Sequence, residues 1–296
     1  MMAAMTAVLD DAAISARLDA ATAVRAMRDA LVAAHRGDLL APPRVHAGAL
    51  TFTAGRLPGR WYGYRAYDTH LGGQQLVVVH TEPDGKLAGI AVGSALGAYR
   101  TGALGGAAVD ALARPEATTL GIVGAGRQAW TQLWAISAVR PIADVAVFSR
   151  DPARREPFAA RARADLGTPA RSVGTARDAV ADRDIVVLAT SSPTPVLDAA
   201  WLSSGTAVTT VGPKQTARAE FGRDLPARAK LTVTDSPDQL GAYDPPALLA
   251  AAPAIHLGAI LATDHPGRTS PDDITLYASV GLAGTEPYLL ARLLGI

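Results

Sequence analysis

The stretch "TTLGIVGAGRQAW" (residues 118–130) joins an apolar run to closely spaced glycines. A buried strand ending at Val123 would lead into the spacing G-x-G-x-x-A, followed by a helix. Gly124 permits a tight turn, Gly126 lets the backbone approach a diphosphate, and Ala129 lets the helix pack closely. A glycine turn without a ligand is the alternative. We predict a dinucleotide-binding turn that comprises Gly124, Ala125, Gly126, Arg127 and Gln128.

Short apolar runs continue on the C-terminal side of this turn. They are "DVAVFSR", "ARSVG", "DIVVLAT", "AVTTVG" and "KLTVTD", and helical or loop segments separate them. Uninterrupted apolar strands of this kind are typical of a parallel sheet covered on both faces. We therefore predict a Rossmann-type doubly wound parallel sheet over residues 113–275.

The chain before residue 113 has a different pattern. A helix is predicted from Asp19 to His35, and four strand-like runs follow, the last two joined by the hairpin signal "EPDGK". The segment 94–114 is predicted to be helical, and the tail after 273 begins as a strand and continues as a helix. This pattern predicts an α+β unit ahead of the parallel sheet.

The composition limits the kinds of ligand. The net charge is +1 with 19% charged residues, so neither nucleic acid nor another polyelectrolyte is expected as a partner. The absence of cysteine excludes disulfides and thiolate metal sites, and we expect no bound metal and a cytoplasmic location.

The N-terminus lacks the pattern of a signal peptide. The most apolar segment, 245–262, contains three prolines, which favours a buried loop–helix region over a membrane span.

The strand after the glycine turn bears on the choice between NAD and NADP. Asp144 has the spacing of about twenty residues expected for a ribose-binding carboxylate, but it stands at the start of that strand. Ser149 and Arg150 stand at its end, and Arg154 follows on the next turn. Hydroxyl and guanidinium groups suit a 2′-phosphate, so we predict a preference for NADP(H). Asp151 leaves NAD(H) possible.

The order of "YRTGA", the glycine turn, "VGPK…E" and "SVG" resembles that of the ornithine cyclodeaminase/mu-crystallin family, from "RVHAG" through "SVGLA". That family includes cyclodeaminases, alanine dehydrogenases and ketimine reductases. The resemblance implies an α/β protein in which a Rossmann-type cofactor domain, residues 113–275, is inserted into an α+β substrate domain made of residues 1–112 and 276–296. It also implies that the sheet of the substrate domain forms a homodimer.

The resemblance also assigns roles to individual residues. Arg44, Arg65 and Arg100 match positions that hold a substrate carboxylate, which a guanidinium binds with two parallel hydrogen bonds. Each arginine could instead belong to a surface or structural ion pair. Further cofactor contacts are expected at the ends of later strands, and each of these could be an ordinary loop residue. They are Thr190, Ser191, Val211, Ser279 and Gly281.

Two positions depart from the cyclodeaminase pattern. Arg65 replaces a lysine, and Lys214 replaces an aspartate in the loop after "TTVG". An ammonium group cannot stabilise an iminium as a carboxylate does, and arginine has too high a pKa to exchange protons. We predict that Lys214, if buried near other cations, is the proton donor and that Arg65 holds the substrate beside it. A solvated Lys214 is the alternative, and His46 or His70 could donate the proton instead.

Together these features predict an NAD(P)H-dependent oxidoreductase that acts on a carbon–nitrogen bond. It would reduce a small, carboxylate-bearing cyclic imine or imino acid, or oxidise the matching amino acid. One alternative is an ornithine cyclodeaminase-type lyase that retains a tightly bound NAD. The other is a mu-crystallin-like protein that binds NADPH or a small molecule without turnover.

Overall fold

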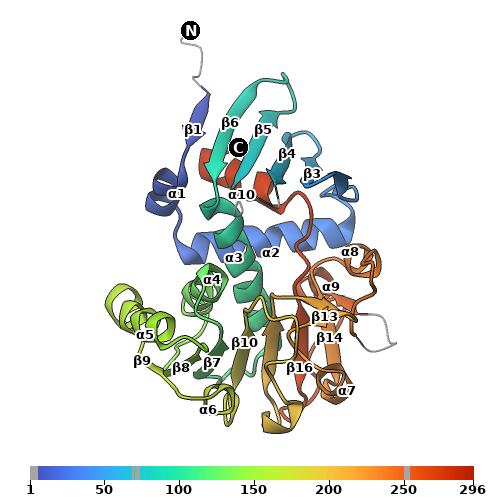
Figure 1. The fold of residues 1–296 in the computed structure, drawn as a ribbon. Helices are drawn as coiled ribbons and strands as arrows, with labels where there is room; N and C mark the ends of the chain where they lie inside the picture. The colour runs from blue at the N-terminus through green and yellow to red at the C-terminus, as the bar shows by residue number, and fades with distance from the viewer. Residues whose placement is uncertain (1–5, 69, 71–73, 250–253) are drawn as a thin grey trace. The chain divides into compact units, whose positions relative to one another are not determined.

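The computed structural model describes residues 6–68, 70, 74–249 and 254–296, and the remainder is drawn in grey in Figure 1. The chain forms two compact units, one of residues 1–100 with 281–296 and the other of residues 101–280. The boundaries predicted from the sequence differ from these. Helix α3 (Ala95–Leu112) crosses the first boundary, and strand β16 (Thr275–Ala278) pairs with strands of the second unit, so the second boundary lies beyond residue 280.

The first unit contains a six-stranded sheet in the order β1-β6-β5-β4-β3-β2. Neighbouring strands are antiparallel except β1 and β6, and the predicted turn "EPDGK" joins β5 to β6. Strand β1 has no counterpart among the predicted strands. The strands are β1 (Ala7–Leu9), β2 (Val45–Ala47), β3 (Leu50–Leu57), β4 (Trp61–Asp68), β5 (Gln75–Thr81) and β6 (Leu87–Gly93).

Helix α10 (Thr285–Leu294) covers the inner face of this sheet and α2 (Ala20–Arg36) packs against α10, as Figure 1 shows. Helix α2 begins where predicted, because the Asp19 side chain accepts a hydrogen bond from the amide of Thr22 at 2.8 Å. Helix α10 packs on α2, β4 and β5. The ring of Tyr288 on α10 meets Trp61 edge-on at 5.8 Å. The short helix α1 (Asp11–Arg17) follows β1.

The opposite face of the same sheet, which we call the outer sheet face, is apolar and exposed. Strand residues alternate between faces, so side chains paired across the strands share a face. The outer sheet face carries these side chains, each at least 37% exposed: Val8, Val45, Phe52, Tyr62, Tyr64, Leu76 and Val92.

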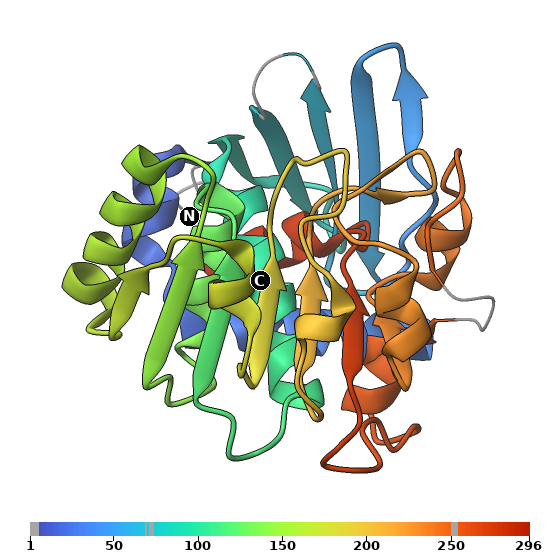
Figure 2. The same cartoon turned by 60° about the horizontal axis from the view of Figure 1, so that its bottom comes forward.

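The second unit is the predicted Rossmann-type sheet. Its eight strands are parallel throughout, in the order β15-β14-β16-β11-β10-β7-β8-β9 (Figure 2). The strands are β7 (Thr119–Val123), β8 (Asp144–Phe148), β9 (Ala170–Ser172), β10 (Ile185–Leu188), β11 (Ala207–Thr210), β14 (Leu231–Thr234), β15 (Ile255–His256) and β16. A small hairpin of β12 (Lys214–Gln215) and β13 (Arg218–Ala219) follows β11.

Apolar side chains cover both faces of this sheet. On one face, Leu133 of α4 (Arg127–Ile136) and Phe158 of α5 (Pro152–Leu166) pack against Ile122 and Val147. On the other face, α6 (Ala176–Val180) and α7 (Asp224–Arg228) join the cluster around Val186 and Leu276. The doubly wound arrangement is therefore confirmed.

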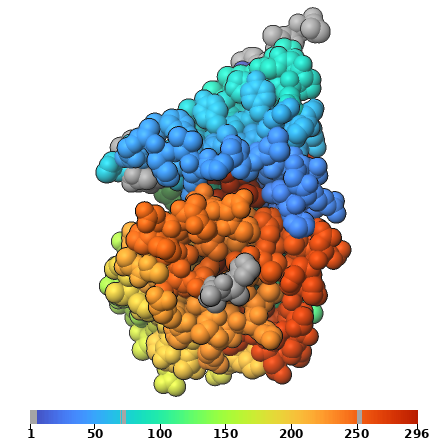
Figure 3. All heavy atoms as spheres, turned by 90° about the vertical axis from the view of Figure 1, so that its right-hand side faces the viewer, coloured from blue at the N-terminus to red at the C-terminus, as the bar shows by residue number. Residues whose placement is uncertain are grey.

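The β14 side of this unit lies at the right in Figure 1 and faces the viewer in Figure 3. Orange segments that include α8 (Pro237–Gly241) and α9 (Leu257–Leu261) lie on it. The segment 245–262 contains β15 and α9, while its residues 250–253 lie outside the described residues. Within the described ranges, no helix is long and apolar enough to cross a membrane.

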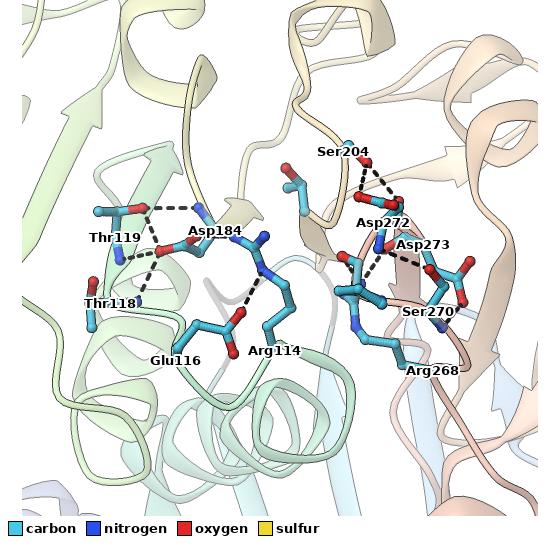
Figure 4. A network of polar contacts seen from close by, with 12 residues as sticks. Arg114, Glu116, Thr118, Thr119, Asp184, Ser204, Arg268, Ser270, Asp272 and Asp273 are labelled. Carbon is cyan, nitrogen blue, oxygen red and sulfur yellow. Dashed lines mark hydrogen bonds and ion pairs between the residues drawn. The ribbon is translucent and has the colours of Figure 1, made fainter.

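A polar network holds the amino ends of the parallel strands (Figure 4). Asp184, just before β10, accepts hydrogen bonds from the amides of Thr118 and Thr119 and pairs with Arg114. Burial alone would raise the pKa of Asp184, but these donors lower it below its usual value. Ion pairs and hydrogen bonds therefore stabilise the amino ends of these strands, which lie at the opposite end of the sheet from the glycine turn.

Candidate functional site

The glycine turn has the geometry predicted for it. Gly124 adopts φ +121°, and a Cβ there would overlap the carbonyl oxygen of Ala189. At Gly126 a Cβ would meet no atom of the described residues within 4 Å, apart from its chain neighbours. Gly126 is also the N-cap of α4, and no side chain caps this helix. Ala129 is fully buried. The turn thus combines a close backbone approach, open space and uncapped amides, which fit a diphosphate group.

A cavity of about 360 Å³ opens beside this turn. Gly124, Ala125 and Gly126 form one wall, and the ends of β8 and β10 supply the others. Of the residues predicted from the sequence, it is lined by Gly124, Ala125, Gly126, Ser149, Arg150, Arg154, Thr190 and Ser191. Arg127, Gln128, Val211 and Ser279, although assigned to the cofactor site, do not line this cavity.

The residues at the end of β8 present cations to this cavity. Arg150 and Arg154 are exposed and line it, while Asp144 lies at the other end of β8 and pairs with Arg171 and Arg183. The carboxylate of Asp151 caps α5 by accepting a hydrogen bond from the amide of Ala153 at 2.9 Å. Two guanidinium groups thus line this part of the cavity, and the exposed carboxylate of Asp151 lies beside them, with Oδ2 3.7 Å from Nε of Arg154.

Lys214 lies on β12 rather than on a solvated loop. Its side chain is buried at 3% exposure, and Nζ donates a hydrogen bond to the carbonyl oxygen of Gly212 at 2.7 Å. The alternative of a solvated lysine is therefore wrong. The ammonium group is therefore shielded from bulk water, and its hydrogen bond to the carbonyl oxygen of Gly212 offsets part of the cost of burying it.

Glu220 organises the strand ends around Lys214 and was not predicted. Its carboxylate is fully buried and accepts hydrogen bonds from the amide and hydroxyl of Thr190, at 2.9 and 2.8 Å, and from the amide of Gly212 at 2.7 Å. Glu220 therefore ties together the loops that follow β10 and β11. The only signal in the sequence was its place after "VGPK".

The segment after β16 is fixed by a second buried carboxylate. Oδ1 of Asp235 accepts a hydrogen bond from the amide of Val280 at 2.8 Å, and Ser279 donates its amide to Thr210. Gly281 belongs to the first unit, and its carbonyl oxygen accepts a hydrogen bond from Nη2 of Arg44 at 2.6 Å. The structure thus places Gly281 beside Arg44 and Arg100, and it does not line the cavity beside the glycine turn.

The three predicted carboxylate-binding arginines meet in the first unit. Nη1 of Arg65 lies 2.6 Å from Oε1 of Glu286, which also pairs with Arg100. A Cβ on Gly281 would lie 2.9 Å from Nη2 of Arg44 and 3.0 Å from Nη1 of Arg100. Arg100 is 4% exposed, and Arg65 also stacks on the ring of Tyr67 at 4.0 Å. The predicted residues are therefore neighbours, although they come from three different elements.

Glu286 is the carboxylate that balances this cluster, and no sequence signal identified it. Burial disfavours its charge, but the fields of Arg100 and Arg65 outweigh burial and hold the pKa of Glu286 at about 2. Burial, together with the nearby Arg100 and Arg44, lowers the pKa of Arg65. Two guanidinium groups pair with Glu286, and that of Arg44 lies near Arg65 and Arg100, so the cluster retains an excess of positive charge that suits an anionic ligand.

The two histidines proposed as alternative proton donors are exposed. Nδ1 of His46 lies 3.1 Å from the hydroxyl of Thr51. His70 bonds Asp68 through its backbone amide. Neither histidine lines the cavity beside the glycine turn.

The lowered pKa of Glu286 predicts a pH-dependent contribution to stability. Because the folded-state pKa lies below 4.5, this contribution is complete above pH 4.5 and is lost as the pH falls towards 2. The difference corresponds to roughly 3 kcal/mol. Urea unfolding at pH 7 should show Glu286→Gln to be less stable by about this amount, with the two proteins converging only as the pH approaches 2. Glu156→Gln, on the exposed surface of α5, is the control; parallel pH profiles for Glu286→Gln and wild type would contradict the expectation.

Comparisons with known proteins establish the family. The profile of the ornithine cyclodeaminase/mu-crystallin family matches residues 7–292, so the chain belongs to this family, as predicted. A Δ1-pyrroline-2-carboxylate reductase of Bacillus cereus is 37% identical over 199 residues, which are 64% of this chain and 61% of the reductase. The matched segments span about three fifths of the length of the first curated relatives.

Solved structures agree with this assignment. A probable ornithine cyclodeaminase from Bordetella pertussis Tohama I has a TM-score of 0.89 at 27% identity, covering 98% of this chain and 96% of that one. Δ1-Pyrroline-2-carboxylate reductase from Thermococcus litoralis, in complex with NADH and L-proline, has a TM-score of 0.87 at 24% identity, with the same coverage. At that identity, the second likeness shows the fold.

Proposed function

We propose that this protein is an NAD(P)H-dependent oxidoreductase that acts on a carbon–nitrogen bond. In the reductive direction, a small imine bearing a carboxylate receives a hydride at carbon and a proton at nitrogen, and yields the corresponding amino acid. The reverse reaction oxidises that amino acid. The observation that carries the proposal is the pairing of Arg65 and Arg100 with the buried Glu286, beside Arg44. The same chain also holds a diphosphate-type glycine turn.

The arginines would bind and orient the substrate carboxylate. A guanidinium group stays charged at any working pH and binds a carboxylate through two parallel hydrogen bonds. Fixing the carboxylate fixes the imine carbon for attack, and this orientation is the main contribution that the first unit would make. Lys214, as a buried cation, is the proposed proton donor to the imine nitrogen, and Arg65 is proposed to hold the substrate rather than to transfer a proton.

The second unit would hold the cofactor, which supplies the hydride when bound. The glycine turn and the start of α4 would bind the diphosphate, and Thr190 and Ser191 would line the cavity beside it. Val211 and Ser279 remain proposed contacts for the other end of the cofactor. Arg150 and Arg154 favour a 2′-phosphate, so NADP(H) is the preferred cofactor and NAD(H) the alternative.

One assay tests this proposal. The protein is incubated with NADPH or NADH and a panel of cyclic imines, or of 2-oxo acids with amines, while the nicotinamide absorbance is followed. The proposal expects turnover with a carboxylate-bearing imine and tighter binding of NADPH than of NADH. Release of ammonia from ornithine without net cofactor change would favour a cyclodeaminase, and NADPH binding without any turnover would favour a binding protein.

We also propose that the outer sheet face forms a homodimer. A contiguous apolar face across six strands is typical of a protein interface. Tyr64→Glu places a charge near its centre, so light scattering after size exclusion should find a dimer for the wild type and a monomer for the variant. Lys86→Glu, in the exposed β5–β6 turn, should remain dimeric. A monomeric wild type, or a dimeric Tyr64→Glu variant, would refute this interface.

A further inference from the structure

Thr53 carries a buried hydroxyl that the proposed mechanism does not use. The residue is 4% exposed, and its Oγ1 has no hydrogen-bond partner among residues 6–68, 70, 74–249 and 254–296. Burying a hydroxyl without a partner costs about 1–3 kcal/mol. Such a group in a folded protein calls for an explanation, and a bound ligand is one.

The register of the sheet places this hydroxyl within the arginine cluster. Thr53 on β3 is the direct partner of Arg65 on β4, so the two side chains share the inner face. On the other side, Val45 pairs with Phe52, and continuing that register by one residue brings Arg44 opposite Thr53. Thr53 therefore stands between two of the three positions that would bind the substrate carboxylate.

The neighbouring backbone supports the same placement. Gly55, two residues further along β3 on the same face, approaches Gly284 so closely that a Cβ would overlap it. Gly284 lies between Gly281, which contacts Arg44 and Arg100, and Glu286, which pairs with Arg65 and Arg100. The inner face of β3 thus borders the segment that completes the cluster.

We propose that Thr53 is a substrate-binding residue whose hydroxyl donates a hydrogen bond to the carboxylate of the substrate. The inference rests on the proposed function, because it adds one neutral donor to the three arginines. A hydroxyl directs its single proton to one oxygen, so it would select between orientations of the carboxylate that the charged groups alone accept equally. Its own burial cost is repaid when the substrate binds.

The same strand provides a matched control. Thr51 lies on the same face, is 1% exposed, and its hydroxyl lies 3.1 Å from Nδ1 of His46. Thr53→Val removes an unpartnered hydroxyl and keeps the side-chain shape, so the ligand-free variant should have the same or a higher melting temperature. Thr51→Val removes a partnered hydroxyl and should lower it.

Carboxylate binding gives the decisive readout. Calorimetry with L-proline, L-alanine and pyruvate, in the presence of NADPH, selects a carboxylate that the wild type binds. The Kd of Thr53→Val for that carboxylate should rise about tenfold or more, the range for a hydrogen bond to a charged group, while that of Thr51→Val should stay within twofold. Thr53→Ser should restore most of the affinity.

The outcomes separate this inference from the proposed function. Unchanged carboxylate affinity in Thr53→Val, or a clear fall in its ligand-free melting temperature, overturns the role of Thr53 alone. A wild type that binds a carboxylate but reduces no imine overturns the proposed function and leaves the Thr53 test valid. A wild type that binds none of the three carboxylates overturns both.

Discussion

Arg100→Ala is expected to lower kcat/KM for Δ1-pyrroline-2-carboxylate about a thousandfold. Arg100 is buried, pairs with Glu286 and adjoins Gly281, so its guanidinium group is screened little by water. Removing one partner of a buried, hydrogen-bonded charge pair, here that of Arg100 and the substrate carboxylate, costs about 2–5 kcal/mol. A loss of about 4 kcal/mol corresponds to the thousandfold fall in kcat/KM. Steady-state kinetics with the cofactor that the wild type prefers gives the value.

Two comparisons separate substrate binding from folding in this experiment. The analogue 1-pyrroline lacks the carboxylate, so its much poorer turnover should differ by less than fivefold between wild type and Arg100→Ala. Arg140→Ala removes a partly buried arginine, paired with Asp110 at 2.6 Å, and should leave kcat/KM unchanged. Arg100→Lys keeps the charge without the planar fork and should be intermediate. Equal losses with both imines would show that Arg100 does not bind the carboxylate.

The sequence was informative about the second unit because its signals are local. The run from Leu120 to Val123, the glycines at 124 and 126 and the small Ala129 specify a strand, a turn and a helix within a dozen residues. The apolar runs of the other parallel strands needed only burial on both faces to be recognised. Strand β1 and the hairpin of Lys214 and Arg218 were missed because two or three residues are too short to show a period.

The candidate site was less predictable because its residues meet only after folding. The family resemblance supplied Arg44, Arg65 and Arg100, but nothing local marks Glu286, which begins an apolar helix, as their counter-charge. Glu220 and Thr53 gain their importance from burial and from strand register, neither of which a single sequence displays. The boundary near residue 280 was misplaced for a similar reason, since β16 is defined by pairing with β11 and β14.

Gly126→Val is expected to weaken cofactor binding at least a hundredfold, with only the small loss of stability that valine causes at the N-cap of a helix. Gly126 has φ −94° and ψ −174°, which valine adopts easily. In the part of the chain that the structure describes, no atom apart from the adjacent residues lies within 4 Å of the position of its Cβ. The added side chain would therefore occupy only the space beside the uncapped amides of α4, where the diphosphate is proposed to lie. Fluorescence titration with NADPH measures the affinity, and calorimetry measures the melting temperature.

Gly124→Ala is the contrasting variant, because the same turn predicts the opposite balance of effects. At φ +121° an alanine is strained, and its Cβ would overlap the carbonyl oxygen of Ala189, so the melting temperature should fall by several degrees. A side chain at Gly124 thus meets protein, whereas one at Gly126 meets only the space left for a ligand. Wild-type NADPH affinity in Gly126→Val would mean that the diphosphate binds elsewhere, and the cofactor assignment of the second unit would then fail.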